Sequence, residues 1–240
     1  EGNDYIEAGV GNDRVYAGAG SDLVFGDAGD DTVYGGRGND SVAGGDGNDH
    51  IFAMAGDDIV TGNGPNNLAS VVVPSDRVNF ENYVVRVGSM GRGNDYVEGG
   101  AGDDLLVTGA GNDLVFGGAG DDRIHSGVGN DIVVGGAGDD SIHAGAGSDL
   151  VFGDGTNALP ANIPTDRVSV LSYILRLSHV NSGNDLIWGG TGSDAILAGA
   201  GNDGVHAGAG NDIVLGQGGN DAIYGGEGDD AIAGGGGDDS

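Results

Sequence analysis

Several residue types are missing from this 240-residue sequence, and each absence excludes a class of function. There is no Cys, which excludes disulfides, thiolate catalysis and Cys-based zinc sites. There is no Lys either, since all eight basic residues are Arg, and this excludes the phosphate-binding loop of nucleotide-binding proteins. With 38 acidic residues the formal net charge is −30, and such a charge opposes binding to nucleic acid.

Long apolar runs are also absent. No stretch approaches the roughly 18 consecutive apolar residues of a membrane-spanning helix, and no secretory signal peptide is visible. The sequence begins at Glu1 and ends at Ser240, inside repeat units at both ends. We therefore expect a fragment of a longer protein, without a transmembrane segment in this part.

What the sequence does contain is Gly, 55 residues of it, and a strict nine-residue period. Twenty-one times an Asp follows a Gly by two positions, in three blocks of seven. The Asp positions are Asp4, Asp13, Asp22, Asp31, Asp40, Asp49, Asp58, then Asp95, Asp104, Asp113, Asp122, Asp131, Asp140, Asp149, and finally Asp185, Asp194, Asp203, Asp212, Asp221, Asp230 and Asp239. A Gly/Asp period of this length is typical of a calcium-binding solenoid and not of a globular enzyme.

An aliphatic residue stands two positions after the Asp in every repeat that is long enough to reach that position. These residues are Ile6, Val15, Val24, Val33, Val42, Ile51, Val60, Val97, Leu106, Val115, Ile124, Val133, Ile142, Val151, Ile187, Ile196, Val205, Val214, Ile223 and Ile232. The unit thus reads G-G-x-G-x-D-x-U-x, where U is aliphatic and the first Gly is often Ala or Asp. The Gly-rich part can adopt positive φ and form a turn, while x-U-x predicts a short strand whose central side chain faces inward.

Each turn therefore combines backbone carbonyls that point to one spot with a carboxylate at a fixed place. A cage made only of oxygen ligands suits Ca²⁺ better than Zn²⁺ or Mg²⁺. The aliphatic core is thin, and a charge of −30 is too large for a compact metal-free fold of this size. We expect a chain that is disordered in low calcium and folds in millimolar calcium.

The repeats resemble those of the RTX (repeats-in-toxin, hemolysin-type calcium-binding nonapeptide repeat) family of secreted bacterial proteins. Residues 117–125, GGAGDDRIH, match the family nonapeptide closely. The resemblance implies an all-β fold, a right-handed parallel β-roll (β-solenoid) with two nonapeptides per turn, in which the 21 Asp carboxylates and loop carbonyls hold calcium. It also implies export by a type I secretion apparatus and folding outside the cell.

The expected number of calcium ions depends on how the turns stack. If each ion bridges one turn to the next, each block of seven half-turns holds about five ions, so roughly 15 are bound in total. The number rises to about 19 if the stacking continues past the interruptions between the blocks.

Two related inserts separate the three blocks. The division is block 1 at 1–63, insert 1 at 64–90, block 2 at 91–154, insert 2 at 155–182 and block 3 at 183–240, along one continuous solenoid. The segment PSDRV at 74–78 corresponds to PTDRV at 164–168, which gives a longer period of about 90 residues. The Gly-poor, apolar parts of the inserts predict strands. Each insert either packs on the roll, with local ion pairs at Asp76–Arg77 and Asp166–Arg167, or docks neighbouring molecules.

The residues on either side of the aliphatic position should face solvent, yet many are apolar. On one face they are Tyr96, Leu114, Phe116, Ile132, Val134, Leu150 and Phe152 in block 2, Leu197, Ile213 and Leu215 in block 3, and Tyr16, Tyr34 and Phe52 in block 1. Exposed apolar stripes of this extent usually mark an interface. Either the inserts or another copy of the chain would cover them.

Other candidate sites have weaker support. His125 and His143 are 18 residues apart and therefore stack on the opposite face, beside Arg123 and Ser141, either as a solvated pair or as a transition-metal site. Adjacent carboxylates such as Asp121-Asp122 could suggest a glycosidase, but they recur with the period of the calcium loops. No Ser/His/Asp constellation stands out, so we predict that the chain is not an enzyme.

Two functional classes remain. The first is a calcium-dependent extracellular structural protein of the bacterial cell surface: a self-associating filament, adhesin stalk or surface-layer component. The 21 repeats, the longer period and the apolar faces favour it. The second is an RTX folding and secretion module of a secreted toxin or hydrolase whose catalytic domain lies outside this sequence.

Overall fold

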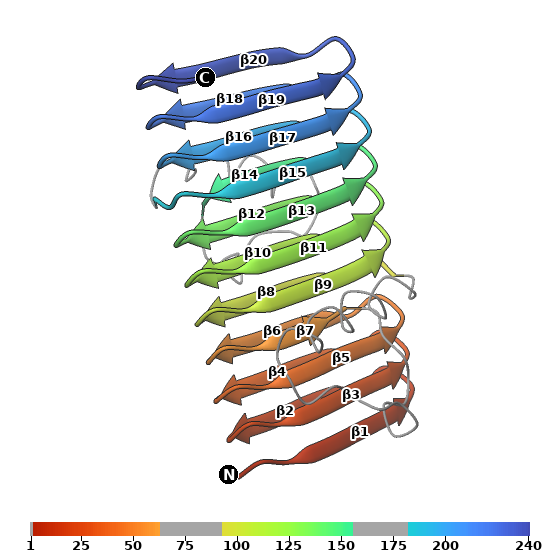
Figure 1. The fold of residues 1–240 in the computed structure, drawn as a ribbon. Coiled ribbons are helices and arrows are strands. Elements are labelled where there is room, and N and C mark those ends of the chain that lie inside the picture. Colours follow the sequence, from red (N-terminus) through yellow and green to blue (C-terminus); the bar gives the residue numbers. More distant parts are fainter. Residues whose placement is uncertain (1, 63–92, 156–181) are drawn as a thin grey trace, which may run out of the picture.

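The computed structural model describes residues 2–62, 93–155 and 182–240, which form β-strands joined by short Gly-rich loops (Figure 1). The strands are β1 (Tyr5–Val10), β2 (Arg14–Ala19), β3 (Leu23–Ala28), β4 (Thr32–Arg37), β5 (Ser41–Asp46), β6 (His50–Ala55), β7 (Ile59–Thr61), β8 (Tyr96–Ala101), β9 (Leu105–Ala110), β10 (Leu114–Ala119), β11 (Arg123–Val128), β12 (Ile132–Ala137), β13 (Ser141–Ala146), β14 (Leu150–Asp154), β15 (Leu186–Thr191), β16 (Ala195–Ala200), β17 (Gly204–Ala209), β18 (Ile213–Gly218), β19 (Ala222–Glu227) and β20 (Ala231–Gly236). These described residues include no helix that is long and apolar enough to cross a membrane.

The strands form two parallel sheets of ten strands each, one with the odd-numbered and one with the even-numbered strands. Each strand pairs with the strand two further along the chain, so that Val115 lies opposite Val133 and Ile124 lies opposite Ile142. One turn of the solenoid therefore contains two nonapeptides. The predicted all-β, parallel β-solenoid is confirmed.

Both sheets continue across the two gaps between the described ranges. β6 pairs with β8 and β7 with β9 across the first gap, and β13 pairs with β15 and β14 with β16 across the second. The register is kept position for position, and the strands form one column in Figure 1. Insert 1 lies wholly outside the described residues, and so does insert 2 except for Gly155 and Ser182. The ion pairs predicted at Asp76–Arg77 and Asp166–Arg167 therefore also lie outside the described residues.

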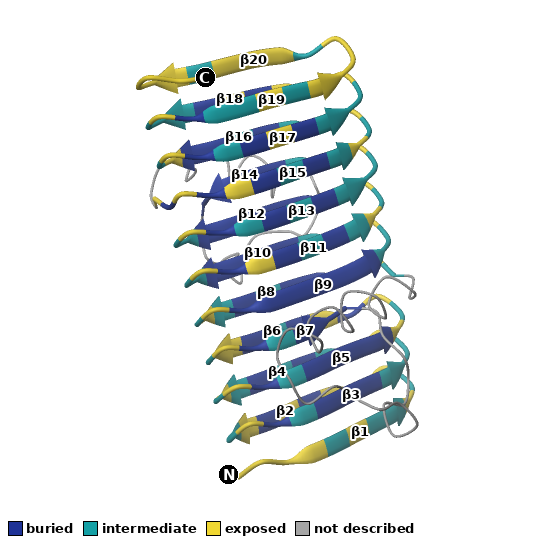
Figure 2. Ribbon diagram, in the orientation of Figure 1, coloured by how far each residue is buried: buried dark blue, intermediate teal, exposed yellow. Residues whose placement is uncertain are grey.

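The interior of the column is a row of aliphatic side chains, one from each half-turn. Those predicted to face inward form the main core cluster, and most of them are completely buried. Ile6 in β1 and Ile223 in β19 are only partly buried, and Ile232 in β20 is 47% exposed. Burial falls off there because an end strand has a neighbour on one side only, which Figure 2 shows as lighter strands at both ends of the column.

For part of the apolar outer face, the structure favours coverage within one chain over coverage by another copy. Phe116, Val134 and Phe152 point away from the main core, yet they are 0% exposed and form a second buried cluster with Tyr96 and Ile132. Strand alternation correctly assigns these side chains to the outer face of the even-numbered sheet, but alternation does not determine whether a face is covered. Because a single chain buries them, they do not form an exposed stripe.

Glycine is required where the loops of successive turns approach each other. Gly11 and Gly120 occupy the same position of the nonapeptide, with φ of +130° and +135°. A Cβ on Gly120 would lie 2.0 Å from the carbonyl oxygen of Gly102 in the preceding turn, whereas a Cβ on Gly11 would meet nothing within 4 Å. Inside the stack, this position therefore excludes side chains by contact as well as by backbone conformation.

This difference provides a matched test. Gly11→Ala should cost only the conformational penalty of a positive φ, about 1 kcal/mol, whereas Gly120→Ala should cost about 3 kcal/mol or more because the backbone must also move. Thermal unfolding in saturating calcium would measure both. Equal losses for the two variants would contradict the close stacking of the loops.

Candidate metal centre

The loops form two rows, one along each edge of the solenoid, and each loop holds its predicted Asp in the same place. Away from the two ends of the column, these Asp side chains are at most 3% exposed. Only the four nearest the ends, Asp4, Asp13, Asp230 and Asp239, are partly or fully exposed. The structure therefore brings the predicted residues together as two continuous rows of buried carboxyl groups.

From Asp22 onward, one oxygen of each repeat carboxylate ties two turns together. Oδ1 of Asp122 accepts the backbone N–H of Asp104, and Oδ1 of Asp140 accepts the N–H of Asp122, both at 2.9 Å. The bond recurs at nineteen steps in the two rows, from the Asp4–Asp22 step to the Asp221–Asp239 step. The steps include those that cross the inserts, so the rows are not interrupted there.

The other carboxylate oxygen is buried and lacks a hydrogen-bond donor in much of the stack. Oδ2 is in this state in Asp22, Asp31, Asp40, Asp49, Asp58, Asp104, Asp122, Asp140, Asp185, Asp194, Asp203, Asp212 and Asp221. A buried polar atom without a partner is costly, and an ionised carboxylate costs more. A cation would supply the missing partner, and carboxylate oxygen is a ligand that Ca²⁺ prefers. The residues present therefore fit a row of calcium ions.

The carboxylates alone cannot complete a calcium shell. Within the described ranges no three Asp, Glu or His side chains gather as a metal-binding group. Ca²⁺ takes six to eight oxygen ligands, so most of them would have to be loop carbonyls and water. The Gly-rich loops provide such carbonyls because they can turn without side-chain interference.

Burial raises the pKa of these carboxyl groups. It raises the pKa of Asp140 to about 9, and the charges of Asp185 and Asp122 add to the effect while the N–H of Asp122 opposes it. The same balance, dominated by burial, raises the pKa of Asp104 to about 8 and that of Asp58 to about 6. Where the pKa lies above 7, as for Asp104 and Asp140, the metal-free stack therefore favours the protonated carboxyl group at neutral pH, whereas a bound dication stabilises the ionised form.

A second row of hydrogen bonds runs beside the first. It is formed by the residue before the Asp, a position that the unit G-G-x-G-x-D-x-U-x leaves variable and that was therefore not predicted to have a role. Asn94 donates its backbone N–H to Oδ1 of Asn48 at 2.8 Å, and Asn112 donates to Asn94 at 2.6 Å. Every one of the 21 repeats has Asn, Asp or Ser at this position. Only short side chains that carry an oxygen occur there. This restriction is the sequence pattern from which the second row could have been predicted.

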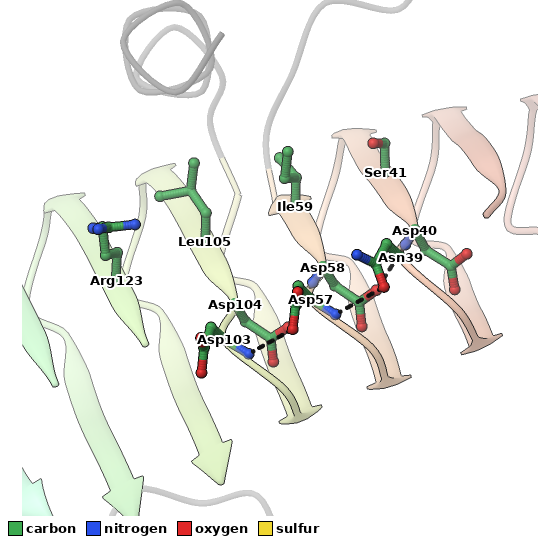
Figure 3. Close-up of a pocket in the computed structure, with 10 residues that line it drawn as sticks. All are labelled: Asn39, Asp40, Ser41, Asp57, Asp58, Ile59, Asp103, Asp104, Leu105 and Arg123. Carbon is green, nitrogen blue, oxygen red and sulfur yellow. Dashed lines mark hydrogen bonds between the residues drawn. The ribbon is translucent and has the colours of Figure 1, made fainter. Parts of the chain in front are cut away.

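Figure 3 shows this second row on the edge that leads into the odd-numbered strands. Asp57 donates its N–H to Asn39, and Asp103 donates to Asp57, at 3.3 and 3.2 Å. Beside them lies a cavity of about 230 Å³ that is also lined by Asp58 and Asp104. Paired carboxylates such as Asp57 and Asp58 thus belong to two structural rows, which explains why they recur with the period.

The comparison with protein families agrees with this geometry. The model of the RTX calcium-binding nonapeptide repeat matches residues 1–33, 34–68, 91–124, 98–133, 125–157, 179–205 and 206–240. The chain belongs to this family. The unmatched residues lie within the two predicted inserts, and the RTX repeats bind Ca²⁺ at multiple sites. Among curated proteins, no relative matched the RTX chain.

Two substitutions at neighbouring positions would distinguish the role of the repeat Asp from that of the residue before it, which forms the second row of hydrogen bonds in this RTX stack. Asp122→Asn keeps an acceptor at Oδ1 but removes the charge and the unpartnered oxygen, so it should destabilise the calcium-loaded fold by about 3 kcal/mol. Asp121→Asn should cost less than about 0.5 kcal/mol, because Asn already occupies that position at Asn112. Calcium titration followed by circular dichroism would measure the midpoint. A larger effect at Asp121 would contradict the assignment.

The raised pKa values also give a pH dependence. Carboxyl groups with pKa values between about 6 and 9 in the fold and near 3.9 in the unfolded chain stabilise the metal-free fold only when protonated. In chelator, the β-sheet signal of circular dichroism should therefore fall as the pH rises from about 4 to 9. In saturating calcium it should stay constant from about pH 6 to 9. A signal in chelator that increases with pH would contradict the argument.

Proposed function

We propose that this RTX chain is a non-catalytic structural segment of an extracellular protein of the bacterial cell surface, such as a filament, adhesin stalk or surface-layer component. The observation that carries the proposal is the unbroken stacking of ten strands in each sheet past both inserts. With about 4.8 Å between neighbouring strands, this segment alone makes a rod about 45 Å long. A regular column of this kind suits a load-bearing element. Its carboxylates take part in the two rows of hydrogen bonds between the loops, which supports a non-catalytic role.

Calcium would make the rod rigid. One ion at each of the nineteen Asp steps gives the upper value of the expected range. Nineteen dications carry 38 positive charges, which equals the 38 acidic residues of the chain. Without these ions the charge of −30 keeps the chain unfolded, a state suited to export by a type I secretion apparatus before folding outside the cell.

The exposed apolar side chains support self-association. Ile213 and Leu215 in β18 are 55% and 39% exposed, and they share one outer face. Tyr16 in β2 and Tyr224 in β19 are more than half exposed as well. Apolar residues on the outer face of a regular sheet favour packing against another copy. The second buried cluster, which contains Phe116 and Phe152, is covered within the chain and does not contribute to such contacts.

Electron microscopy and light scattering with and without chelator would test the proposal. Calcium should convert the chain into rods that associate, and chelator should reverse both effects. Ile213→Ser combined with Leu215→Ser should reduce the association without changing the calcium midpoint of folding. The matched control is Ala231→Ser with Ala233→Ser, at the paired positions of β20, which should associate like the original chain.

A monodisperse monomer in saturating calcium and at high protein concentration would contradict the structural role. That outcome would favour the second class, a folding and secretion module of a secreted toxin or hydrolase, because such a module requires calcium-dependent folding but not association.

A further inference from the structure

The outer face of the even-numbered sheet is buried over only part of its length. Phe116, Val134 and Phe152 lie opposite one another in β10, β12 and β14, and all three are 0% exposed. Leu215 has the same repeat position in β18 and is 39% exposed, although β16 and β20 flank it on both sides. Neighbouring strands alone therefore do not bury this position, and a further layer must cover β10 to β14.

The described residues supply no such layer, because they consist of the two sheets and the loops between them. The chain does, however, reach this face where insert 2 begins. Gly155 follows β14 and is buried, and a Cβ on it would lie 2.4 Å from Cγ1 of Val134. Asp154, at the position that Gly136 occupies in β12, is only 1% exposed. The covering layer therefore begins at the end of β14.

The 26 residues from 156 to 181 follow Gly155 and lie outside the described residues. They are long enough to form the layer, because the four strands from β8 to β14 extend about 14 Å across the sheet and an extended chain of this length reaches about 80 Å. The segment is also apolar between 168 and 177, where seven of ten residues are Val168, Val170, Leu171, Tyr173, Ile174, Leu175 and Leu177. Such a run predicts strands with an apolar side to bury.

We propose that insert 2 docks on the outer face of the even-numbered sheet of its own chain, from β8 to β14, and covers Phe116, Val134 and Phe152. Of the two roles that the sequence allows for an insert, packing on the roll and docking a neighbouring molecule, this insert has the first. The proposal does not depend on whether the protein is a surface filament or a secretion module.

The same reasoning assigns insert 1 to the opposite sheet. On the outer face of the odd-numbered sheet, Phe25 in β3 and Val107 in β9 are both 2% exposed. His206 has the same repeat position in β17 and is exposed, although β15 and β19 flank it. Insert 1 follows the odd-numbered β7 and insert 2 the even-numbered β14, because seven strands separate them. Successive inserts therefore leave opposite edges of the column and cover opposite faces.

The parts of the two faces that no insert covers alternate as well. On the even-numbered sheet, Tyr16 in β2 is 65% exposed. On the odd-numbered sheet, a row of stacked rings runs from His125 in β11 to Tyr224 in β19. His125 and His143 stack face to face in this row, with ring centroids 4.7 Å apart, so their nitrogens do not converge on one metal ion.

Deleting either insert leaves an intact nonapeptide, which gives a matched pair of variants. Removal of residues 63–90 joins Gly62 to Gly91 and produces GGRGND, the same six residues as 35–40. Removal of residues 156–182 joins Gly155 to Gly183 and produces GDGGND, which follows the pattern GDAGDD of 26–31. Both deletions therefore keep the register of the calcium loops, and circular dichroism in calcium would show that the variants are folded.

The chain has no Cys, so a single introduced thiol reports access to each face. In saturating calcium and dilute solution, uncharged iodoacetamide should alkylate Val134→Cys about ten-fold faster or more after removal of 156–182, and at the original rate after removal of 63–90. Val107→Cys should show the reverse. Leu215→Cys, on the uncovered part of the even-numbered sheet, should react rapidly in all three chains.

Val134→Cys that stays protected after removal of 156–182, or that is exposed by removal of 63–90 instead, would overturn the proposal. Protection of Val134→Cys that is lost when the full chain is diluted would overturn it as well, because a second copy would then be the covering layer.

Substitutions within the full chain provide a second test that leaves every loop unchanged. Tyr173→Ser, Leu175→Ser and Leu177→Ser together should expose Val134→Cys to alkylation. The control is the matched triple substitution in insert 1, Tyr83→Ser with Val85→Ser and Val87→Ser, which should leave Val134→Cys protected. Equal alkylation rates in the two triple variants would contradict the docking of insert 2 on this face.

Discussion

The structure depends on the different roles of the two carboxylate oxygens in the Asp that recurs every nine residues. One oxygen accepts the N–H of the Asp in the neighbouring turn, as Asp122 does from Asp104, and this bond fixes the stacking of the loops. In much of the stack, as in Asp122, the other oxygen is buried without a donor. Carboxylates stacked one turn apart also repel each other. The hydrogen bonds therefore define the geometry of the stack, and a cation between the turns would offset the burial and repulsion of its carboxylates at neutral pH.

The remaining features follow from this stack. Loops in close contact leave no space for a Cβ at positions such as Gly120, so Gly recurs with the Asp. The constant register places equivalent positions of the repeat above one another. This produces the aliphatic core, the two rows of hydrogen bonds and the row of stacked rings from His125 to Tyr224. A core with one aliphatic side chain per nine residues is thin. Metal binding and strand pairing must therefore supply much of the stability that a globular domain obtains from burial.

Much of this could be predicted from the sequence because the determinants are local and repeated. The Gly, Asp and aliphatic positions have one physical role each, and the structure places the Asp side chains and core residues accordingly. The row formed by Asn48 and its equivalents was missed, because its pattern is a restriction to three residue types. The burial of Phe116 and Phe152 could not be derived, because strand alternation gives the direction of a side chain and not what covers it. One continuous solenoid was expected because the same nonapeptide resumes after each insert, and β6 pairs with β8 and β13 with β15 across the two gaps.

In the middle of the rod the two edges differ in charge although they share one hydrogen-bond pattern. On the edge that leads into the odd-numbered strands, the outer row contains Asp57, Asp103, Asp121 and Asp139 in succession. The corresponding stretch of the other edge contains Asn48, Asn94, Asn112 and Asn130. Asn and Asp present the same acceptor, so the bonds are equivalent and only the second atom of the side chain differs. With one dication per inner step, the amide edge would carry about one positive charge per turn and the acidic edge about none. The choice between Asn and Asp therefore gives the middle of the rod unlike edges without altering its fold, and neighbouring rods would meet these stretches as electrostatically distinct surfaces.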